Sequence, residues 1–352
     1  MTPVTIRIDL GSDTATKPSK AMLGFMLDCP VGDDQKQEDP TVNRLQDQVA
    51  GLLGMEAALF LPSATMANEI ALKVHTRPGD EAIVEAGAHF VTAEAGGPAF
   101  LSGVMMTRLD GKRGIFDAGQ VERAIRPDGP HYPPTSLVCV EQTTNLGGGA
   151  VWPQNRLREV VAVARQYGLA THMDGARLMN AVVASGVPAH LHVQGFDSVT
   201  LCLSKGLACP VGAMLAGSGG FIQEARRYKH LFGGAMRQAG VIAGAGLFAL
   251  DNNIERLAED HENARLLARL LAEIPGIAID PSAIETNIVF FDVAGTGLSG
   301  QELVDALSQR GTRVGARWRD TVIRAVTHCD VGRVDIETAA RQIGEIVAGL
   351  AR

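Results

Sequence analysis

Residues 196–212, FDSVTLCLSKGLACPVG, contain the lysine from which the rest of the sequence can be interpreted. The apolar run 199–203 predicts a buried strand that ends in a turn carrying Ser204 and Lys205. Burial at a strand end disfavours the charged form of a lysine, and a lysine that forms a Schiff base must lose that charge. A lysine that buries its aliphatic stem and extends its amine to solvent is an equally good interpretation of this segment alone.

A second polar strand end lies upstream, in residues 169–180, LATHMDGARLMN. An apolar strand ends here at His172, Asp174 and Arg177, and a helix follows. An aspartate in this place is also a common helix cap. Together, the aspartate and the lysine match the needs of pyridoxal phosphate, because a carboxylate keeps the pyridine nitrogen protonated and a lysine forms the imine. The pair therefore favours a pyridoxal-phosphate site.

Length and composition are those of an ordinary globular protein with two domains. The chain has 352 residues, of which 46% are hydrophobic and 20% charged. A formal net charge of −7 argues against nucleic acid or an anionic membrane as the main partner. The five cysteines lack metal-binding spacing, so we expect reduced thiols, no metal site and a cytoplasmic protein. The first 18 residues lack a signal-peptide core, and residues 239–250 are too few to span a bilayer.

Strand and helix signals alternate over most of the chain, which predicts an α/β fold: an open, mostly parallel sheet with helices on both faces. We expect a large domain over residues 1–250, N-terminal arm included, and a small α+β domain over residues 251–352. Outside the two segments above, expected strands are residues 6–10, 57–61, 82–84, 104–109, 137–140, 213–215, 277–279, 287–293 and 322–326. One helix is expected to begin at Pro40 behind an Asp39 cap. Further helices are expected over residues 64–74, 94–101, 154–167, 238–273, 301–310 and 336–351, with a hinge near Asn252 or within the helix over residues 238–273 that starts the smaller domain.

The turn Ser63-Ala64-Thr65 joins an expected strand to an alanine-rich helix. Free backbone N–H groups and the helix dipole make such a turn an anion site, although simple helix capping by Ser63 explains it equally well in isolation. Ligands of open α/β sheets bind beyond the carboxyl ends of the strands, where Ser63, Asp174 and Lys205 are expected. We therefore expect a cofactor phosphate at this turn.

Two histidines and one arginine are further candidates. His89 and His131 fall next to expected strands; a lone histidine is more often structural, and His89, which follows Ala-Gly-Ala, is the better candidate to face a cleft. Arg324 is flanked by apolar residues at a strand end. Its guanidinium suits bidentate binding of a carboxylate, although a structural ion pair is equally common.

With these residues in place, the sequence resembles the low-specificity threonine aldolase group within the β-eliminating lyase family of fold-type I pyridoxal-phosphate enzymes. The resemblance runs nearly from end to end. Its motifs are SDTATKP from Ser12, VGDD from Val31, EDPTVN from Glu38, LPSATMAN from Leu61, HMDGAR from His172, CLSKGL from Cys202, GGAMRQAG from Gly233, DHENA from Asp260, TNIVF from Thr286 and VTHCDV from Val326. Several are specific in both residue type and order.

The resemblance implies a role for each candidate residue. Lys205 would form the imine and Asp174 would pair with the pyridinium nitrogen. The other implied cofactor-binding residues are Ser63, Ala64 and Thr65 at the phosphate, His89 stacked on the ring, Arg177 near the ring and Arg237 from across a subunit boundary. The implied substrate-binding residues are Ser12, Arg177 and Arg324 at the carboxylate, with His89 or His131 as the base. Shared sites of this kind imply a homodimer or homotetramer.

The sequence departs from the family pattern at several positions. Gly11 stands where arginine is usual, Lys36 where tyrosine is common, Ala64 where glycine is usual, Thr144 where histidine is usual and His230 where lysine is common. Lys205 and Asp174 match the family, so the cofactor chemistry is expected to be intact. The departures leave open which β-substituent is preferred.

The expected reaction is retro-aldol cleavage of an L-3-hydroxy-α-amino acid of the threonine or allo-threonine type to glycine and an aldehyde. β-Elimination or transamination on the same scaffold is an alternative, since Lys205 and Asp174 would look identical. A non-catalytic phosphate- or nucleotide-binding protein is the other alternative. The glycine run at residues 216–220, which would support it, lacks the Rossmann spacing.

Overall fold

A computed structural model describes residues 5–315 and 320–350 of the chain. It separates into two compact units, residues 18–254 and a smaller unit that joins residues up to 17 with residues from 255 onward. The division from the sequence placed the N-terminal arm with the large domain. In the structure the arm groups with the C-terminal part, because β1 (Ile8–Leu10) pairs in parallel with β10 (Thr312–Val314).

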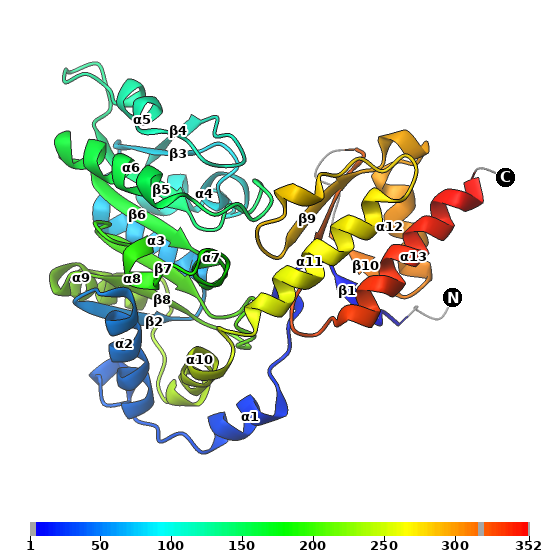
Figure 1. Ribbon diagram of the computed structural model, residues 1–352. Helices are drawn as coiled ribbons and strands as arrows, with labels where there is room; N and C mark the ends of the chain where they lie inside the picture. The colour runs from blue at the N-terminus through cyan, green and yellow to red at the C-terminus, as the bar shows by residue number, and fades with distance from the viewer. Residues whose placement is uncertain (1–4, 316–319, 351–352) are drawn as a thin grey trace. The chain divides into compact units, whose positions relative to one another are not determined.

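The larger unit is built on a seven-stranded sheet in the order β2-β8-β7-β6-β5-β3-β4 (Figure 1). The strands are β2 (Ala57–Leu61), β3 (Glu81–Glu85), β4 (Met105–Leu109), β5 (Thr135–Glu141), β6 (Ala170–Gly175), β7 (Ser198–Cys202) and β8 (Ala213–Gly217). Neighbours from β4 to β7 pair in parallel, whereas β8 is antiparallel to both β7 and β2. All strands except β8 therefore run in one direction, which confirms the mostly parallel sheet and brings their carboxyl ends to one edge.

Local signals set the ends of the helices around this sheet. The helices are α1 (Lys20–Leu27), α2 (Pro40–Leu53), α3 (Ala64–His75), α4 (His89–Thr92), α5 (Ala118–Ala124), α6 (Gln154–Gln166), α7 (Leu178–Ser185), α8 (Ala189–His192), α9 (Gly219–Leu231) and α10 (Gly240–Asn252). As expected, α2 begins at Pro40, where the Asp39 carboxylate accepts hydrogen bonds from Thr41 N and Val42 N. It ends at Leu53 and is capped by Gly54, whose φ of 63° lies in the left-handed region that glycine tolerates.

Two expected helices differ from the structure. Residues 94–101 do not form one helix: α4 ends at Thr92, and after Gly96 and Gly97 a short π-helix covers Pro98–Ser102. The expected helix over residues 238–273 is divided into α10 and α11 (Leu257–Ala272), and the division follows Asn252, near which a hinge was expected. In both places a polar or glycine-containing turn interrupts an apolar pattern that is otherwise compatible with a continuous helix.

The smaller unit has its own hydrophobic core, in which α11, α12 (Gly300–Gln309) and α13 (Arg333–Leu350) pack against short strands. Strands β9 (Ile288–Asp292) and β11 (Val322–Val326) form an antiparallel pair, and the expected strand at residues 277–279 is reduced to a single bridge between Ala278 and Asp292. The five cysteines are free thiols. Within residues 5–315 and 320–350, no helix has both the length and the apolar composition needed to cross a membrane.

Candidate active site

The carboxyl edge of the sheet gathers the polar residues that follow its strands. His89 comes shortly after β3, and Lys205 comes shortly after β7. Glu141 at the end of β5 pairs in register with Asp174 on β6, and Asp174 pairs with Thr200 on β7. The expected grouping of a lysine and an aspartate at neighbouring strand ends is therefore present in the larger unit.

Asp174 is buried and held in one orientation. Its Oδ1 accepts a hydrogen bond from the backbone N of Ala176 at 3.0 Å, and its Oδ2 accepts one from Asn68 Nδ2 at 2.9 Å. Because only one lone pair of each oxygen is used by these donors, the carboxylate retains acceptor capacity for a further donor.

His89 lies between two carboxyl groups. Its backbone N donates to Glu141 Oε2 at 2.8 Å, and its Nδ1 is 2.8 Å from Glu94 Oε1. The hydrogen bond to Glu94 raises the pKa of His89; burial lowers that pKa, Asp174 raises it, and Lys205 lowers it. The influence of both Asp174 and the Lys205 amine on this ring identifies these side chains as one electrostatic cluster.

Lys205 is partly buried in the turn between β7 and β8. The backbone of this turn is internally bonded: Ala208 N donates to Lys205 O at 2.8 Å, and Leu203 N donates to Gly212 O at 3.0 Å. These bonds fix the backbone from which the lysine side chain extends, so its amine is presented from a defined position beside β7.

The turn before α3 combines both interpretations made from the sequence. Ser63 Oγ accepts a hydrogen bond from Met66 N at 3.1 Å, so Ser63 does cap the helix. The first turn of a helix nevertheless leaves backbone N–H groups without intrahelical acceptors, and the exposed Ser63 and Thr65 flank them here. This helix end, at the carboxyl end of β2, is therefore suited to an anion such as a phosphate.

The remaining candidates of the larger unit lie in different surroundings. Arg177 is buried between β6 and α7, and its backbone N donates to Gln142 O at 3.0 Å. Arg237 is exposed and pairs with Asp33, with Nη1 3.1 Å from Oδ2. His131 is exposed in the turn before β5. That turn is at the amino end of a strand whose carboxyl end carries Glu141, so within one chain the structure does not join His131 to the Lys205 cluster.

Ser12 and Arg324 belong to the smaller unit, where the structure brings their segments together. Arg324 on β11 donates from Nη2 to the backbone O of Gly11 at 3.4 Å, directly before Ser12. Ser12 Oγ accepts from Thr14 N at 3.2 Å. The two residues implied to bind a substrate carboxylate are thus neighbours.

Sequence reasoning missed the polar groups beneath the cluster. Asn68 and Glu69 on α3 and Glu94 after α4 are all buried, and Asn68 Nδ2 donates to Glu94 Oε1 at 2.8 Å as well as to Asp174. A polar Asn-Glu pair inside an alanine-rich helix was the available signal for the first two, whereas Glu94 had none.

Ligand atoms of His89, Glu94 and Asp174 lie within 4.8 Å of one another, a spacing that a metal ion could bridge. The amide N–H group of Asn68 points at both carboxylates, however. A donor with partial positive charge in that position serves the function of a cation, so the group fits a hydrogen-bonded network better than a metal site.

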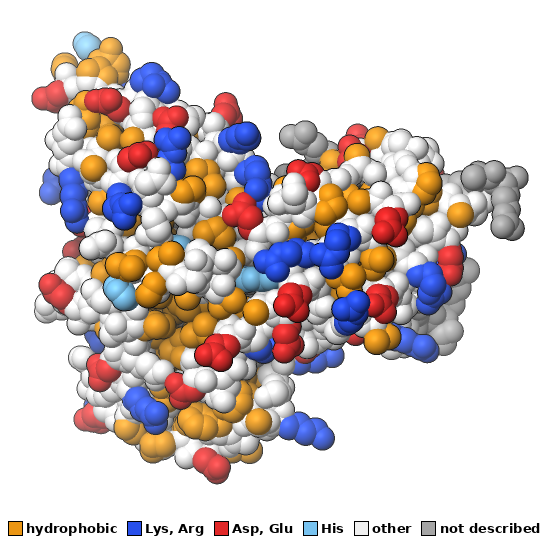
Figure 2. Space-filling view, viewed as in Figure 1, with side chains coloured by type: hydrophobic (Ala, Val, Ile, Leu, Met, Phe, Trp, Pro, Cys, Tyr) orange, Lys and Arg blue, Asp and Glu red, His pale blue; other side chains and the backbone are white. Residues whose placement is uncertain are grey.

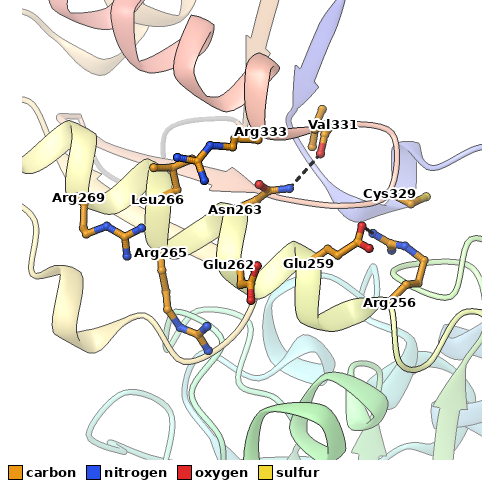
Figure 3. Close-up of a pocket in the computed structure, with 11 residues that line it drawn as sticks. Arg256, Glu259, Glu262, Asn263, Arg265, Leu266, Arg269, Cys329, Val331 and Arg333 are labelled. Atoms are coloured by element: carbon orange, nitrogen blue, oxygen red, sulfur yellow. Dashed lines mark hydrogen bonds and ion pairs between the residues drawn. The ribbon is translucent and has the colours of Figure 1, made fainter.

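The smaller unit also contains a cavity of about 440 Å³ between α11 and residues 329–333 (Figure 3). Arginine and glutamate side chains line it, and Asn263 Nδ2 crosses to the backbone O of Val331 at 3.3 Å. Arg256, at one end, is already paired with Asp260 at 2.6 Å. None of the site residues proposed from the sequence lines this cavity.

Comparison with known proteins identifies relatives over nearly the whole chain. The model of the family described as beta-eliminating lyase matches residues 9–294. The low specificity L-threonine aldolase of Escherichia coli K12 is 43% identical over 338 residues, which are 95% of this chain and 97% of that protein. A probable low-specificity L-threonine aldolase of Arabidopsis thaliana is 41% identical over 345 residues, 96% of each chain. The solved threonine aldolase of Leishmania major, 19% identical, shares the fold with a TM-score of 0.81 over 97% of this chain and 99% of that one.

Proposed function

Since the chain belongs to the beta-eliminating lyase family, we propose that it is a carbon–carbon lyase that cleaves L-3-hydroxy-α-amino acids of the threonine or allo-threonine type into glycine and an aldehyde. The observation that carries this proposal is the cluster of Lys205, Asp174 and His89 at the carboxyl edge of the sheet. Relatives that are more than 40% identical over nearly their whole length, and that are named threonine aldolases, support the choice of reaction.

The residues at this edge fit pyridoxal phosphate as the cofactor. Lys205 would bind it covalently, the buried Asp174 carboxylate would accept the pyridine N–H, and residues 63–65 would hold the phosphate at the start of α3. His89, Arg177 and, from a neighbouring subunit, Arg237 complete the proposed cofactor-binding set. When bound, the cofactor would take up the electron pair released from the cleaved carbon–carbon bond.

The protein's own groups would bind the substrate and move its proton. We assign the substrate carboxylate to Arg324, Ser12 and Arg177, because a guanidinium offers paired donors that match a carboxylate. His89 would remove the proton of the β-hydroxyl group. We favour His89 over His131 because His89 belongs to the Lys205 cluster within a single chain, whereas His131 is exposed before β5.

The proposal can be tested by replacing the lysine. Lys205→Ala should abolish both the visible absorbance of the purified protein and the release of glycine, whereas Lys112→Ala, which changes an exposed lysine, should leave both intact. A coloured and active Lys205→Ala protein would remove Lys205 from the scheme. A wild-type protein that takes up no cofactor would favour the alternative of a non-catalytic phosphate- or nucleotide-binding protein.

Product analysis separates the proposed reaction from the other reactions of this scaffold. Incubation with threonine, allo-threonine and other β-hydroxy amino acids should yield glycine and an aldehyde. Ammonia with a keto acid would indicate β-elimination instead, and an aminated cofactor would indicate transamination. The same panel identifies the preferred β-substituent. This preference has to be measured on this chain, because it departs from the family pattern at Gly11, Lys36, Thr144 and His230.

We also propose that the chain forms a homo-oligomer, a dimer or a homotetramer with shared active sites. Hydrophobic side chains gather on the surface over α1 and α10 (Figure 2), and Leu23, Leu27, Val31 and Val241 are among the exposed ones. A contiguous apolar surface of this kind is typical of an interface. Light scattering of the purified protein tests the oligomer, and cell fractionation tests the cytoplasmic location that we expect from the free thiols.

A further inference from the structure

A continuous hydrogen-bond chain runs beneath the sheet edge to the proposed base. His172 Nε2 is 3.4 Å from Asn68 Oδ1, and Asn68 Nδ2 donates to both Asp174 Oδ2 and Glu94 Oε1. Because both carboxylate oxygens require a donor, the amide of Asn68 has a defined orientation, with its oxygen toward His172. Glu94 is thereby held in one position, and the same Oε1 atom contacts His89 Nδ1.

Glu94 lies beside a second buried glutamate, Glu69. Among the described residues, no donor reaches either side-chain oxygen of Glu69 or Oε2 of Glu94. Two neighbouring buried carboxyl groups are stable when one carries a proton and donates it in a hydrogen bond to the other. Since Glu94 Oε1 already accepts from Asn68, the proton belongs on Glu69. Burial and the adjacent Glu94 raise the pKa of Glu69 to about 9, in agreement with this assignment.

With the shared proton on Glu69, Glu94 can only accept the hydrogen bond that joins it to His89. A carboxylate accepts and does not donate, so the hydrogen atom lies on Nδ1 of His89, and in the neutral ring the lone pair lies on Nε2. The other groups that act on this ring are Asp174, which favours its protonation, and Lys205, which opposes it. Glu94 Oε1 is the acceptor that the structure places 2.8 Å from Nδ1, so Glu94 determines which ring nitrogen carries the proton.

We propose that Glu94 is a positioning residue, which holds His89 in the Nδ1–H tautomer so that Nε2 exchanges the proton of the substrate hydroxyl. The proton held between Glu69 and Glu94 keeps a single charge in this buried pair. The part of the proposal that concerns substrate rests on the lyase activity proposed above. The tautomer of His89 and its dependence on Glu94 are properties of the protein itself.

Nitrogen-15 NMR of histidine-labelled protein measures these properties with or without cofactor, and His89→Asn identifies the signal. Wild-type protein should show neutral His89 protonated at Nδ1. In Glu94→Gln, the amide oxygen still accepts from Nδ1, so the tautomer should remain, while loss of the negative charge should lower the pKa by about one unit or more. The acid limb of the pH profile of kcat/KM should move to lower pH by a similar amount.

Glu81→Gln is the matched control, because Glu81 is another buried glutamate of the larger unit and is paired with Arg126. It should leave the titration of His89 unchanged. Neutral His89 protonated at Nε2 in the wild-type protein, or a His89 pKa that is the same in Glu94→Gln, would overturn the proposal. Absence of glycine release from the wild-type protein, with the NMR results as expected, would refute the proposed function and leave the role of Glu94 intact.

Discussion

Replacement of Lys229 by methionine should destabilise the larger unit strongly. Lys229 Nζ and Asp34 Oδ2 lie 2.6 Å apart, and the two side chains are only 4% and 3% exposed. The pair joins α9 to the turn at residues 33–37, and Asp34 N donates to the backbone O of Arg237 at 2.9 Å. The same contact therefore supports the segment that carries a residue proposed to act across a subunit boundary.

The free-energy cost of Lys229→Met depends on the charge that stays buried after the substitution. Burial lowers the pKa of Lys229, and the hydrogen bond to Asp34 only partly offsets this, so attraction within the pair does not fully repay the desolvation of the lysine. Lys229→Met leaves the Asp34 carboxylate buried without this partner, which costs about 3–5 kcal/mol. The double variant Lys229→Met/Asp34→Leu removes both charges and should lie within about 1 kcal/mol of the wild type.

Urea unfolding of the four proteins of this cycle, followed by circular dichroism, measures the free energies. Arg156→Met is the control, because Arg156 and its partner Glu159 are 47% and 46% exposed. It should cost less than about 0.5 kcal/mol. The reasoning fails if Lys229→Met costs no more than this control, or if the double variant is as unstable as the single one.

Three further substitutions test other parts of the structure. A Cβ added by Gly97→Ala would overlap the buried Glu69 carboxyl, so the variant should lose about 1–3 kcal/mol in urea unfolding, whereas Gly220→Ala, with open space around its Cβ, should lose less. Burial lowers the pKa of His172 to about 3. Between pH 6.5 and 3 this histidine is therefore protonated in the unfolded chain and neutral in the folded chain, so the free energy of unfolding falls as the pH falls. From pH 7 to 5 the wild type should therefore lose about 2 kcal/mol more than His172→Gln, and equal losses would contradict the buried neutral ring. Ser63→Ala removes the cap of α3 and should cost about 1 kcal/mol without cofactor; a weakened affinity for inorganic phosphate would show that the same turn binds anions.

The fold, and the positions of Asp174 and Lys205 at neighbouring strand ends, follow from the sequence because their signals are local. Apolar strands that end in polar turns indicate where Asp174 and Lys205 lie along the chain, and alternation with helices predicts the parallel sheet that brings such turns together. The start of α2 follows from Asp39 and Pro40 for the same reason. Neither inference needs a contact between distant segments.

What sequence reasoning missed depends on such contacts. The pairing of β1 with β10, which assigns the N-terminal arm to the smaller unit, joins segments about 300 residues apart and leaves no local signal. Nothing in the local sequence distinguishes Glu94 from other glutamates, and only the fold brings it into contact with His89 and Asn68. His131 stays a prediction from sequence: within one chain it is exposed before β5, at the opposite end of the strand from Glu141.

Burial also sets the charge of the site. Glu94, Glu141 and Asp174 all act on His89, and Glu69 lies beside Glu94. Four ionised carboxylates there would repel one another and any anionic substrate. Burial raises the pKa of Glu69 to about 9 and that of Glu141 to about 7, so protonation removes much of this negative charge near neutral pH. The carboxylates of Glu94 and Asp174 both accept hydrogen bonds from Asn68. In the proposed function, Glu94 would act on His89 and Asp174 on the pyridine nitrogen of the cofactor. In that proposal, the raised pKa values of Glu69 and Glu141 prevent an excess of negative charge that would repel a substrate carboxylate.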